Sequence, residues 1–139
     1  MLEILGIKIV KGFPPNIEQI KKFFKIDHFQ EGIAFAYGDT IYSIGKIEED
    51  LIRHESVHIK QQKKIGGAEI WWKRYIEDPK FRLDQEVPAY RVQYHAWRMA
   101  NEKKYHKMAL EQLAKHLSGP IYGHMIDYKN AYKIIAEEL

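Results

Sequence analysis

The sequence predicts a small α+β domain in which a short N-terminal β-sheet is followed by a mostly helical C-terminal half. Two observations predict it. β-rich runs bounded by turn residues are confined to the first third of the chain, and helical periodicity with start and stop signals fills the rest. The 139 residues, 45% of them hydrophobic, are enough for one core, and we find no repeat or linker. We therefore predict a single domain over residues 1–139.

The first predicted elements are a strand and an amphipathic helix. Residues 4–10 alternate and are rich in isoleucine, which is typical of a strand that ends at Gly12. Asn16 can then cap a helix over residues 17–26, where isoleucine and phenylalanine recur at helical spacing and lysines occupy the other face. The apolar stripe of this helix is expected to be core.

A β-hairpin and a capped helix come next. The segment GIAFAYGDTIYSIG, residues 32–45, places two β-rich runs on either side of Gly38 and Asp39, a dipeptide that favours a tight turn. From residue 47 to about 64 the pattern is helical, with acidic residues in the first turn and lysines at the end, before Gly66. This helix therefore has both a start and a stop.

Helices are predicted for the remainder of the chain. A helix over 68–76 is expected to break at Pro79, and a short irregular link then leads to Asp84, which can cap a long helix over 85–101. Pro88 fits that helix as a first-turn residue, where no intrahelical amide bond is lost.

The last predicted elements are two helices joined by a loop. One helix covers 103–117 and ends at the Ser-Gly-Pro segment 118–120. A loop that carries Tyr122 and His124 leads to a final helix over 126–138.

The composition argues against several classes of protein. Lysine and arginine number 22 and the acidic residues 19, so the net charge of +3 is a mild excess spread along the chain, and no nucleic-acid partner is expected. No apolar stretch approaches the roughly 20 residues of a membrane-spanning helix, and the N-terminus lacks a secretory signal pattern. We therefore expect a cytoplasmic protein with no membrane partner. Cysteine is absent, so a transition metal must be held by histidine and carboxylate.

The run HESVH, which begins at His54, is an H-E-x-x-H motif inside the predicted helix 47–64. His54 and His58 are four residues apart, so their imidazoles project from one face and can meet one ion. Glu55 lies about 100° round the helix from His54, where it can reach a water on the metal rather than the metal itself. The motif therefore predicts a Zn²⁺ site with Glu55 as general base and acid.

A catalytic zinc site needs a third protein ligand and keeps its fourth position for water. Glu86 is the preferred candidate, because it lies 28 positions after His58 on the next long helix, with chain-reversing turns in between. His95 and Asp84 are the alternatives.

The oxyanion that develops during peptide hydrolysis needs a second donor. The sequence offers five tyrosine and histidine candidates: Tyr90, Tyr94, His95, Tyr122 and His124. Tyr122 and His124 are preferred, because a glycine-flanked loop between helices can fold over a cleft.

The HESVH run, Gln61, and the later run WWKRYIEDPKFRLDQEVPAY with Glu86 and Tyr90 together resemble the gluzincin branch of zinc metallopeptidases. The resemblance is to the minimal single-domain members called minigluzincins, and it covers roughly residues 40–95. It implies a zincin-like domain with His54, His58 and Glu86 as zinc ligands and Glu55 as base and acid. It also implies that the segment GDTIYSIG, residues 38–45, is an edge strand that aligns the substrate.

The chain departs from the family pattern around the glutamate ligand. Many gluzincins carry N-E-x-x-S-D there, whereas this chain reads DQEVPAY over residues 84–90. Tyr90, four residues after Glu86, takes the place of the acidic residue that supports a zinc-bound histidine. Substrate specificity therefore does not transfer from the family.

The predicted function is hydrolysis of peptide bonds in a peptide or protein substrate by a zinc metalloendopeptidase. The alternatives are a non-catalytic, zinc-stabilised interaction module, a nucleic-acid binder, a regulatory protease that cuts one partner protein, and a latent form whose C-terminal helix covers the cleft. The oligomeric state is not predicted. An aromatic series is expected to pack helices together rather than to stack on bases: Trp71, Trp72, Tyr75, Tyr90, Tyr94 and Trp97. Three histidines are expected to lie on the surface: His28, His106 and His116.

Overall fold

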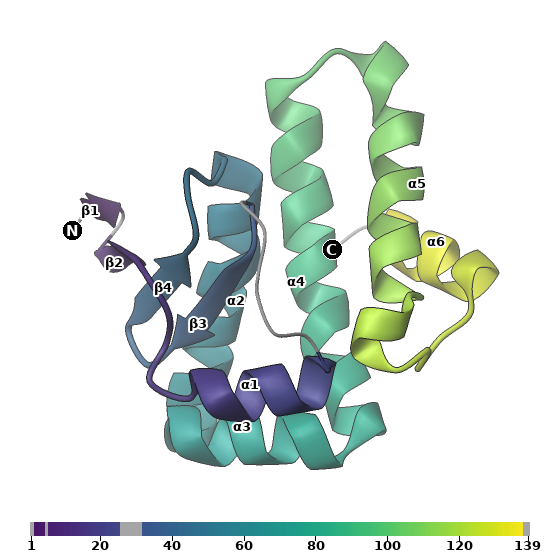
Figure 1. Cartoon of the computed structure of the whole chain (residues 1–139). Helices are drawn as coiled ribbons and strands as arrows, with labels where there is room; N and C mark the ends of the chain where they lie inside the picture. Colours follow the sequence, from purple (N-terminus) through teal and green to yellow (C-terminus); the bar gives the residue numbers. More distant parts are fainter. Residues whose placement is uncertain (1, 5, 26–31, 138–139) are drawn as a thin grey trace.

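The computed structural model describes residues 2–4, 6–25 and 32–137, with main chain alone for 2–4. Within these ranges the chain has the predicted α+β architecture, a small N-terminal sheet followed by helices (Figure 1). His28 and residue 26, the last of the predicted helix 17–26, lie outside the described residues.

The sheet contains four short strands in the order β1-β2-β4-β3. They are β1 (Leu2–Ile4), β2 (Ile7–Lys11), β3 (Ala34–Tyr37) and β4 (Thr40–Ser43). β1 and β2 are antiparallel, β2 and β4 parallel, and β4 and β3 antiparallel. The prediction of one strand over residues 4–10 is therefore wrong. The chain reverses at Gly6, whose φ of 77° glycine adopts without strain, and two strands form instead.

The predicted hairpin is confirmed as β3 and β4, joined at Gly38 and Asp39. Gly38 has a φ of 68°, which the tight turn requires. The prediction that residues 38–45 form an edge strand is wrong, because β4 pairs with β2 on one side and with β3 on the other. The edge strands of the sheet are β1 and β3, and β3 packs against a helix.

The described residues form six α-helices and two short 3-10 helices, which cover most of the chain beyond residue 48 (Figure 1). They are α1 (Ile17–Phe24), α2 (Glu49–Ile65), α3 (Ala68–Glu77), α4 (Pro79–Ala100), η1 (Lys103–Tyr105), α5 (His106–Leu117), η2 (Pro120–Tyr122) and α6 (Tyr128–Ala136). α2 ends as predicted at Gly66, which has the left-handed φ of 112° that favours glycine there. The predicted helix over 103–117 is η1 followed by α5. The predicted helix over 126–138 corresponds to α6, which begins at Tyr128 rather than at residue 126, and residue 138 lies outside the described residues.

The prediction for the start of α4 is wrong. No irregular link precedes Asp84. Instead, Asp78 caps the helix, and its Oδ1 accepts hydrogen bonds from the main-chain N–H groups of Lys80 (3.0 Å) and Phe81 (3.2 Å). Pro79 is the first helical residue, where its missing N–H costs nothing. Pro88 consequently lies inside the helix rather than in its first turn.

Two hydrophobic clusters flank the place where α2 packs against α4. One holds α4, α5 and α6 together through residues such as Leu110 and Leu117, and the other joins α1, β3 and α3 around Trp71. The aromatic series is buried as predicted, except that Trp97 is only partly buried. Among the described residues, no helix combines the length and the apolar character that crossing a bilayer requires.

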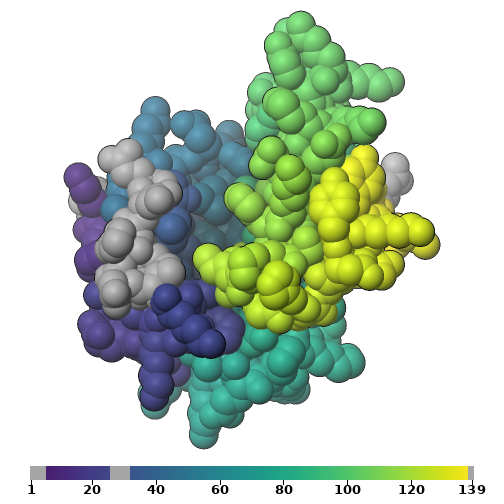
Figure 2. Space-filling model, turned by 45° about the vertical axis from the view of Figure 1, so that its right-hand side comes forward, coloured from purple at the N-terminus to yellow at the C-terminus, as the bar shows by residue number. Residues whose placement is uncertain are grey.

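A cleft of about 470 Å³ opens between β3, α2 and the segment that follows α5. In Figure 2 this cleft is the hollow between the blue side of the molecule and the yellow-green end of α5. Its floor is formed by polar residues of α2 and α4, and the free edge of β3 forms one wall. The fold therefore brings the H-E-x-x-H motif to the floor of a cleft.

Candidate metal centre

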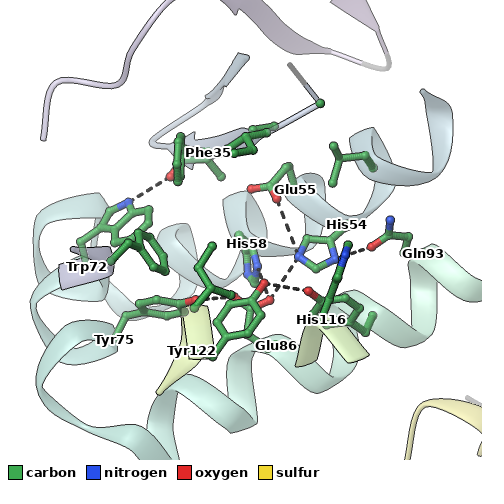
Figure 3. Close-up of a pocket in the computed structure, with 18 of the residues that line it drawn as sticks. Phe35, His54, Glu55, His58, Trp72, Tyr75, Glu86, Gln93, His116 and Tyr122 are labelled. Carbon is green, nitrogen blue, oxygen red and sulfur yellow. Dashed lines mark hydrogen bonds and ion pairs between the residues drawn. The ribbon is translucent and has the colours of Figure 1, made fainter. Parts of the chain in front are cut away.

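Three buried side chains from two helices converge on the floor of the cleft (Figure 3). His54 and His58 come from α2, and Glu86 comes from α4. Their exposed fractions are 4%, 4% and 3%. Each offers one ligand atom, and these atoms all lie within 4.8 Å of one another. The structure thus brings together the three residues that the sequence predicted as ligands, in a group that can bind a metal ion.

The spacing of these atoms fits a small divalent cation. Glu86 Oε1 lies 3.1 Å from His54 Nε2 and 3.2 Å from His58 Nε2. Two ligand atoms at zinc-like bond lengths on a tetrahedral ion are about 3.3 Å apart. The two distances to Glu86 Oε1 therefore match those between ligands of a common ion, and the ligand atoms of the two histidines lie within 4.8 Å of each other.

The tautomer of His58 follows from its hydrogen-bond partners. Gln61 Nε2 donates to the main-chain carbonyl of Gln85 at 2.9 Å, and a carbonyl can only accept. The other end of that amide, Gln61 Oε1, lies 2.8 Å from His58 Nδ1 and must accept its proton. The Nε2 atom of neutral His58 therefore presents a lone pair toward Glu86.

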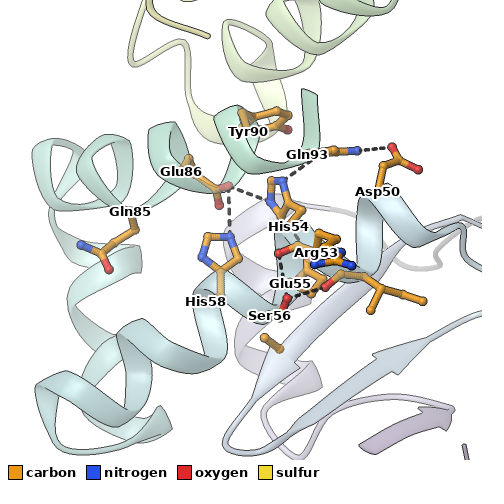
Figure 4. Close-up of polar contacts among 12 residues, drawn as sticks. Asp50, Arg53, His54, Glu55, Ser56, His58, Gln85, Glu86, Tyr90 and Gln93 are labelled. Carbon is orange, nitrogen blue, oxygen red and sulfur yellow. Dashed lines mark hydrogen bonds and ion pairs between the residues drawn. The ribbon is translucent and has the colours of Figure 1, made fainter. Parts of the chain in front are cut away.

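His54 has the same arrangement with a different glutamine. Gln93 Oε1, from α4, lies 2.8 Å from His54 Nδ1. In the neutral state, both imidazoles therefore direct Nε2 lone pairs at a carboxylate oxygen (Figure 4). Three acceptor atoms in contact repel one another unless a positive charge lies between them.

Without a metal, that positive charge is a proton. Burial opposes the charged form of His58, but the neighbouring Glu86 carboxylate outweighs it and raises the pKa of His58 to about 9. Burial also acts to raise the pKa of Glu86, yet its contacts with His58 and His54 lower that pKa overall. At neutral pH the metal-free site therefore holds a His58–Glu86 ion pair, and a cation must displace the proton.

Tyr75 occupies the second oxygen of Glu86. Its hydroxyl donates to Glu86 Oε2 at 2.6 Å, and burial together with the Glu86 charge raises the pKa of Tyr75 well above its usual value. The phenol therefore stays protonated and remains a donor. Oε1 alone is left for a cation, so Glu86 is arranged to act as a single-oxygen ligand.

Glu55 lies beside the triad on the side that faces β3. Its Oε2 is 3.7 Å from His54 Nε2, and the main-chain N–H of Ala36 donates to its carboxylate. Burial raises the pKa of Glu55, and the two histidines only partly offset that effect. A carboxylate with a raised pKa beside a metal site is suited to exchanging protons with a bound water.

The structure separates the two preferred oxyanion candidates. Tyr122 lines the cleft, and its hydroxyl lies 2.8 Å from that of Tyr90, whose ring meets the His54 ring edge-on. His124 is exposed and does not line the cleft. Its Nδ1 lies 3.3 Å from the main-chain carbonyl of Ser118. The chain turns between them at Gly123, with a φ of 81°, so the two side chains point differently. The prediction of His124 as a catalytic residue is therefore not supported.

The alternative third ligands lie elsewhere. His95 is exposed and lines a separate pocket beside Arg53, and Asp84 is exposed and pairs with Lys80 at 3.3 Å. Tyr94, another oxyanion candidate, is buried in the cluster of α4, α5 and α6. Among the described residues, these three side chains do not join the triad.

Sequence reasoning missed several residues that touch the site. Gln93 lies seven residues after Glu86 on the same face of α4, and that spacing was the available signal. Tyr75 was expected only as core, and no local pattern marks it as a partner of Glu86. His116 is exposed, as predicted for a surface histidine, but it also lines the cleft.

Comparisons of the chain with protein-family models, with curated proteins and with solved structures give no match. The interpretation of the site therefore depends on its geometry and on the H-E-x-x-H motif.

Proposed function

We propose that this protein is a zinc metalloendopeptidase of the gluzincin type. The observation that carries the proposal is the contact between Glu86 Oε1 and the Nε2 atoms of His54 and His58, three buried atoms that can bind one cation when it displaces the proton of His58. Glu55 lies beside them without joining the ligand set. Zinc-dependent peptide hydrolysis needs these groups: two histidines one helical turn apart, a carboxylate ligand from a second helix, and an acidic residue that does not bind the metal.

Zinc is the preferred metal for three reasons. Imidazole nitrogens suit borderline metals such as zinc, and no cysteine competes for the site. Three protein ligands with an open fourth position are typical of catalytic zinc, whereas structural zinc sites are closed by four. The two glutamine amides and Tyr75 hold all three ligands in place, as the outer partners of zinc ligands generally do.

When bound, the ion would make a water molecule acidic and polarise a peptide carbonyl. Glu55 would then accept the proton of the attacking water and deliver it to the leaving amine, a role that its raised pKa favours. Burial raises the pKa of Tyr122, so its hydroxyl remains a hydrogen-bond donor at the cleft wall. We assign Tyr122 as the residue that stabilises the developing oxyanion.

A peptide substrate would pair with the free edge of β3. The carbonyl of Ala36 accepts hydrogen bonds from Gln62 Nε2 (2.8 Å) and Trp72 Nε1 (3.0 Å), so it points away from β4. Alternate residues of an antiparallel strand direct their main-chain groups to the same side, so those of Ala34 also face outward. Both alanines line the cleft. Ala36 is already bonded on that side, through its carbonyl to Gln62 and Trp72 and through its N–H to Glu55, so an extended peptide would pair with β3 through the main chain of Ala34.

The proposal is tested by comparing Glu55→Gln with His54→Ala. Hydrolysis of casein is measured with and without a chelator, and zinc content is measured on the same samples. We expect wild-type activity that the chelator abolishes, an inactive Glu55→Gln that retains zinc, and an inactive His54→Ala that lacks it. A Glu55→Gln variant as active as the wild type, or wild-type zinc without hydrolysis of casein or of a peptide library, would favour the non-catalytic interaction module.

A further inference from the structure

A hydrogen-bond chain links Asp50 to His54 through a neutral amide. Gln93 Nε2 donates to Asp50 Oδ2 at 3.0 Å, and Gln93 Oε1 lies 2.8 Å from His54 Nδ1. Asp50 and His54 are four residues apart on α2, so they share one face, and Gln93 reaches both from α4 (Figure 4). The chain runs from a first-turn carboxylate of α2 to the metal group.

The direction of this chain is fixed at its Asp50 end. An ionised carboxylate only accepts hydrogen bonds, so the NH₂ group of Gln93 must face Asp50 and its oxygen must face His54. The proton of neutral His54 is then held on Nδ1, and the Nε2 lone pair is left for a cation. If the amide turned over, its NH₂ would face Nδ1 and favour the tautomer with the proton on Nε2, pointing at Glu86 Oε1.

We propose that Asp50 is a positioning residue of the metal centre, because it sets the orientation of the Gln93 amide and, through it, the tautomer and ring orientation of His54. This inference rests on the metal-binding role in the proposed function. The two histidines differ in this respect. The amide that holds His58 is anchored by a main-chain carbonyl, which side-chain substitution does not remove. Of the two amides, only the one that holds His54 depends on a charged side chain for its orientation.

The test is the affinity for Zn²⁺, measured at one pH by competition with a chromophoric chelator. Gln93→Ala is expected to weaken binding by roughly 10- to 100-fold, the usual effect of losing an outer partner of a metal ligand. Asp50→Ala is expected to weaken it by about 3- to 10-fold, because the amide remains but loses its fixed orientation. Asp50→Asn keeps an acceptor oxygen and should lose less. In the Gln93→Ala background, Asp50→Ala should have no further effect.

Glu49→Ala is the matched control. Glu49 is the neighbouring acid in the same first turn of α2, so its removal has the same effect on charge and on the helix N-terminus. Its carboxylate pairs with Arg53 at 3.0 Å and is mostly exposed, with no link to His54. We expect the zinc affinity of Glu49→Ala to match that of the wild type.

The possible results separate this inference from the proposed function. Equal losses of zinc affinity in Asp50→Ala and Glu49→Ala would show a long-range charge effect and overturn the positioning role. The positioning role would also be overturned if Asp50→Ala lowered the zinc affinity as much in the Gln93→Ala background as in the wild type. Wild-type zinc binding that Asp50→Ala leaves unchanged overturns only this inference, whereas a wild-type protein that binds no zinc overturns both.

Discussion

A buried glutamate lies on each side of the histidine pair of α2, and the two glutamates differ in their contacts and in their pKa values. On the α4 side, burial acts to raise the pKa of Glu86, but its contacts with the two imidazoles outweigh burial and lower that pKa. On the β3 side, Glu55 has one main-chain donor and more distant histidines, so burial dominates and its pKa is raised. The exposed fractions of the two residues are similar, 3% and 6%.

The difference shows that contacts, rather than burial alone, set the role of each carboxylate. A glutamate held ionised by two imidazoles is suited to bind a cation, and one with a raised pKa is suited to carry a proton. Opposite pKa shifts in neighbouring acids are a common mark of a catalytic site. A substitution of one glutamate should therefore change its own role and leave that of the other intact.

Glu55→Gln should have the largest effect on activity. The variant keeps the size and burial of the side chain but removes the proton acceptor, so we expect a loss of peptide hydrolysis of about 10²- to 10⁴-fold. Zinc content should not change, because Glu55 is outside the ligand group. Glu49→Gln, an exposed acid on the same helix, is the control and should keep full activity. Loss of zinc from Glu55→Gln would contradict the separation of roles.

Glu86→Gln should have the largest effect on stability. It removes the buried counter-charge of His58, and an uncompensated buried charge typically costs about 3–5 kcal/mol. Urea denaturation of the metal-free protein near pH 7 measures this change. Glu55→Gln is the comparison, and it should not lower the free energy of unfolding, because burial disfavours the charged form of Glu55. Equal destabilisation by the two variants would remove the distinction between them.

The stability of the metal-free protein should depend on pH through His58. Its pKa is raised from 6.5 in the unfolded chain to about 9 in the folded one. The resulting stabilisation is fully present below pH 6.5 and is lost as the pH rises through about 9. Chemical denaturation at pH 6.5 and 9.5 should therefore give the lower free energy of unfolding at pH 9.5, and His58→Gln should reduce that difference. A wild-type protein at least as stable at pH 9.5 would contradict the ion pair.

Tyr75→Phe should have the smallest effect of the four. It leaves Glu86 Oε2 without its buried donor, which typically costs about 1–3 kcal/mol. We expect reduced thermal stability with the zinc site still present. Tyr94→Phe is the control, because Tyr94, on α4, is buried like Tyr75 but its hydroxyl makes no hydrogen bond among the described residues. A similar loss in both variants would show that Tyr75 acts by packing alone.

Elements with strong local signals could be predicted from the sequence. The i, i+4 histidines lie on α2 because acidic first-turn residues and Gly66 define that helix, and Gly38 fixes the hairpin. The start of α4 differs from the prediction because Asp78 and Pro79 also fit a helix break. The same dipeptide also serves as a cap followed by a proline at the first helical position.

Long-range features were harder to predict. The parallel pairing of β2 with β4 makes β4 an inner strand and leaves β3 at one edge of the sheet. It joins strands far apart in the chain, so no local pattern marks it. Glu86 could be predicted because a third ligand, histidine or carboxylate, was needed and Glu86 lies near the start of the next predicted long helix. Gln93 and Tyr75 could not, because neutral partners of metal ligands have no distinctive sequence signal.

The central claim is that His54, His58 and Glu86 bind one zinc ion. Metal analysis of the purified protein after reconstitution with zinc and removal of excess metal tests it most directly. We expect about one zinc per chain in the wild type and in Glu55→Gln, with little in His54→Ala or Glu86→Ala. A wild-type protein that retains no zinc, or one whose zinc content is unchanged by His54→Ala, would contradict it.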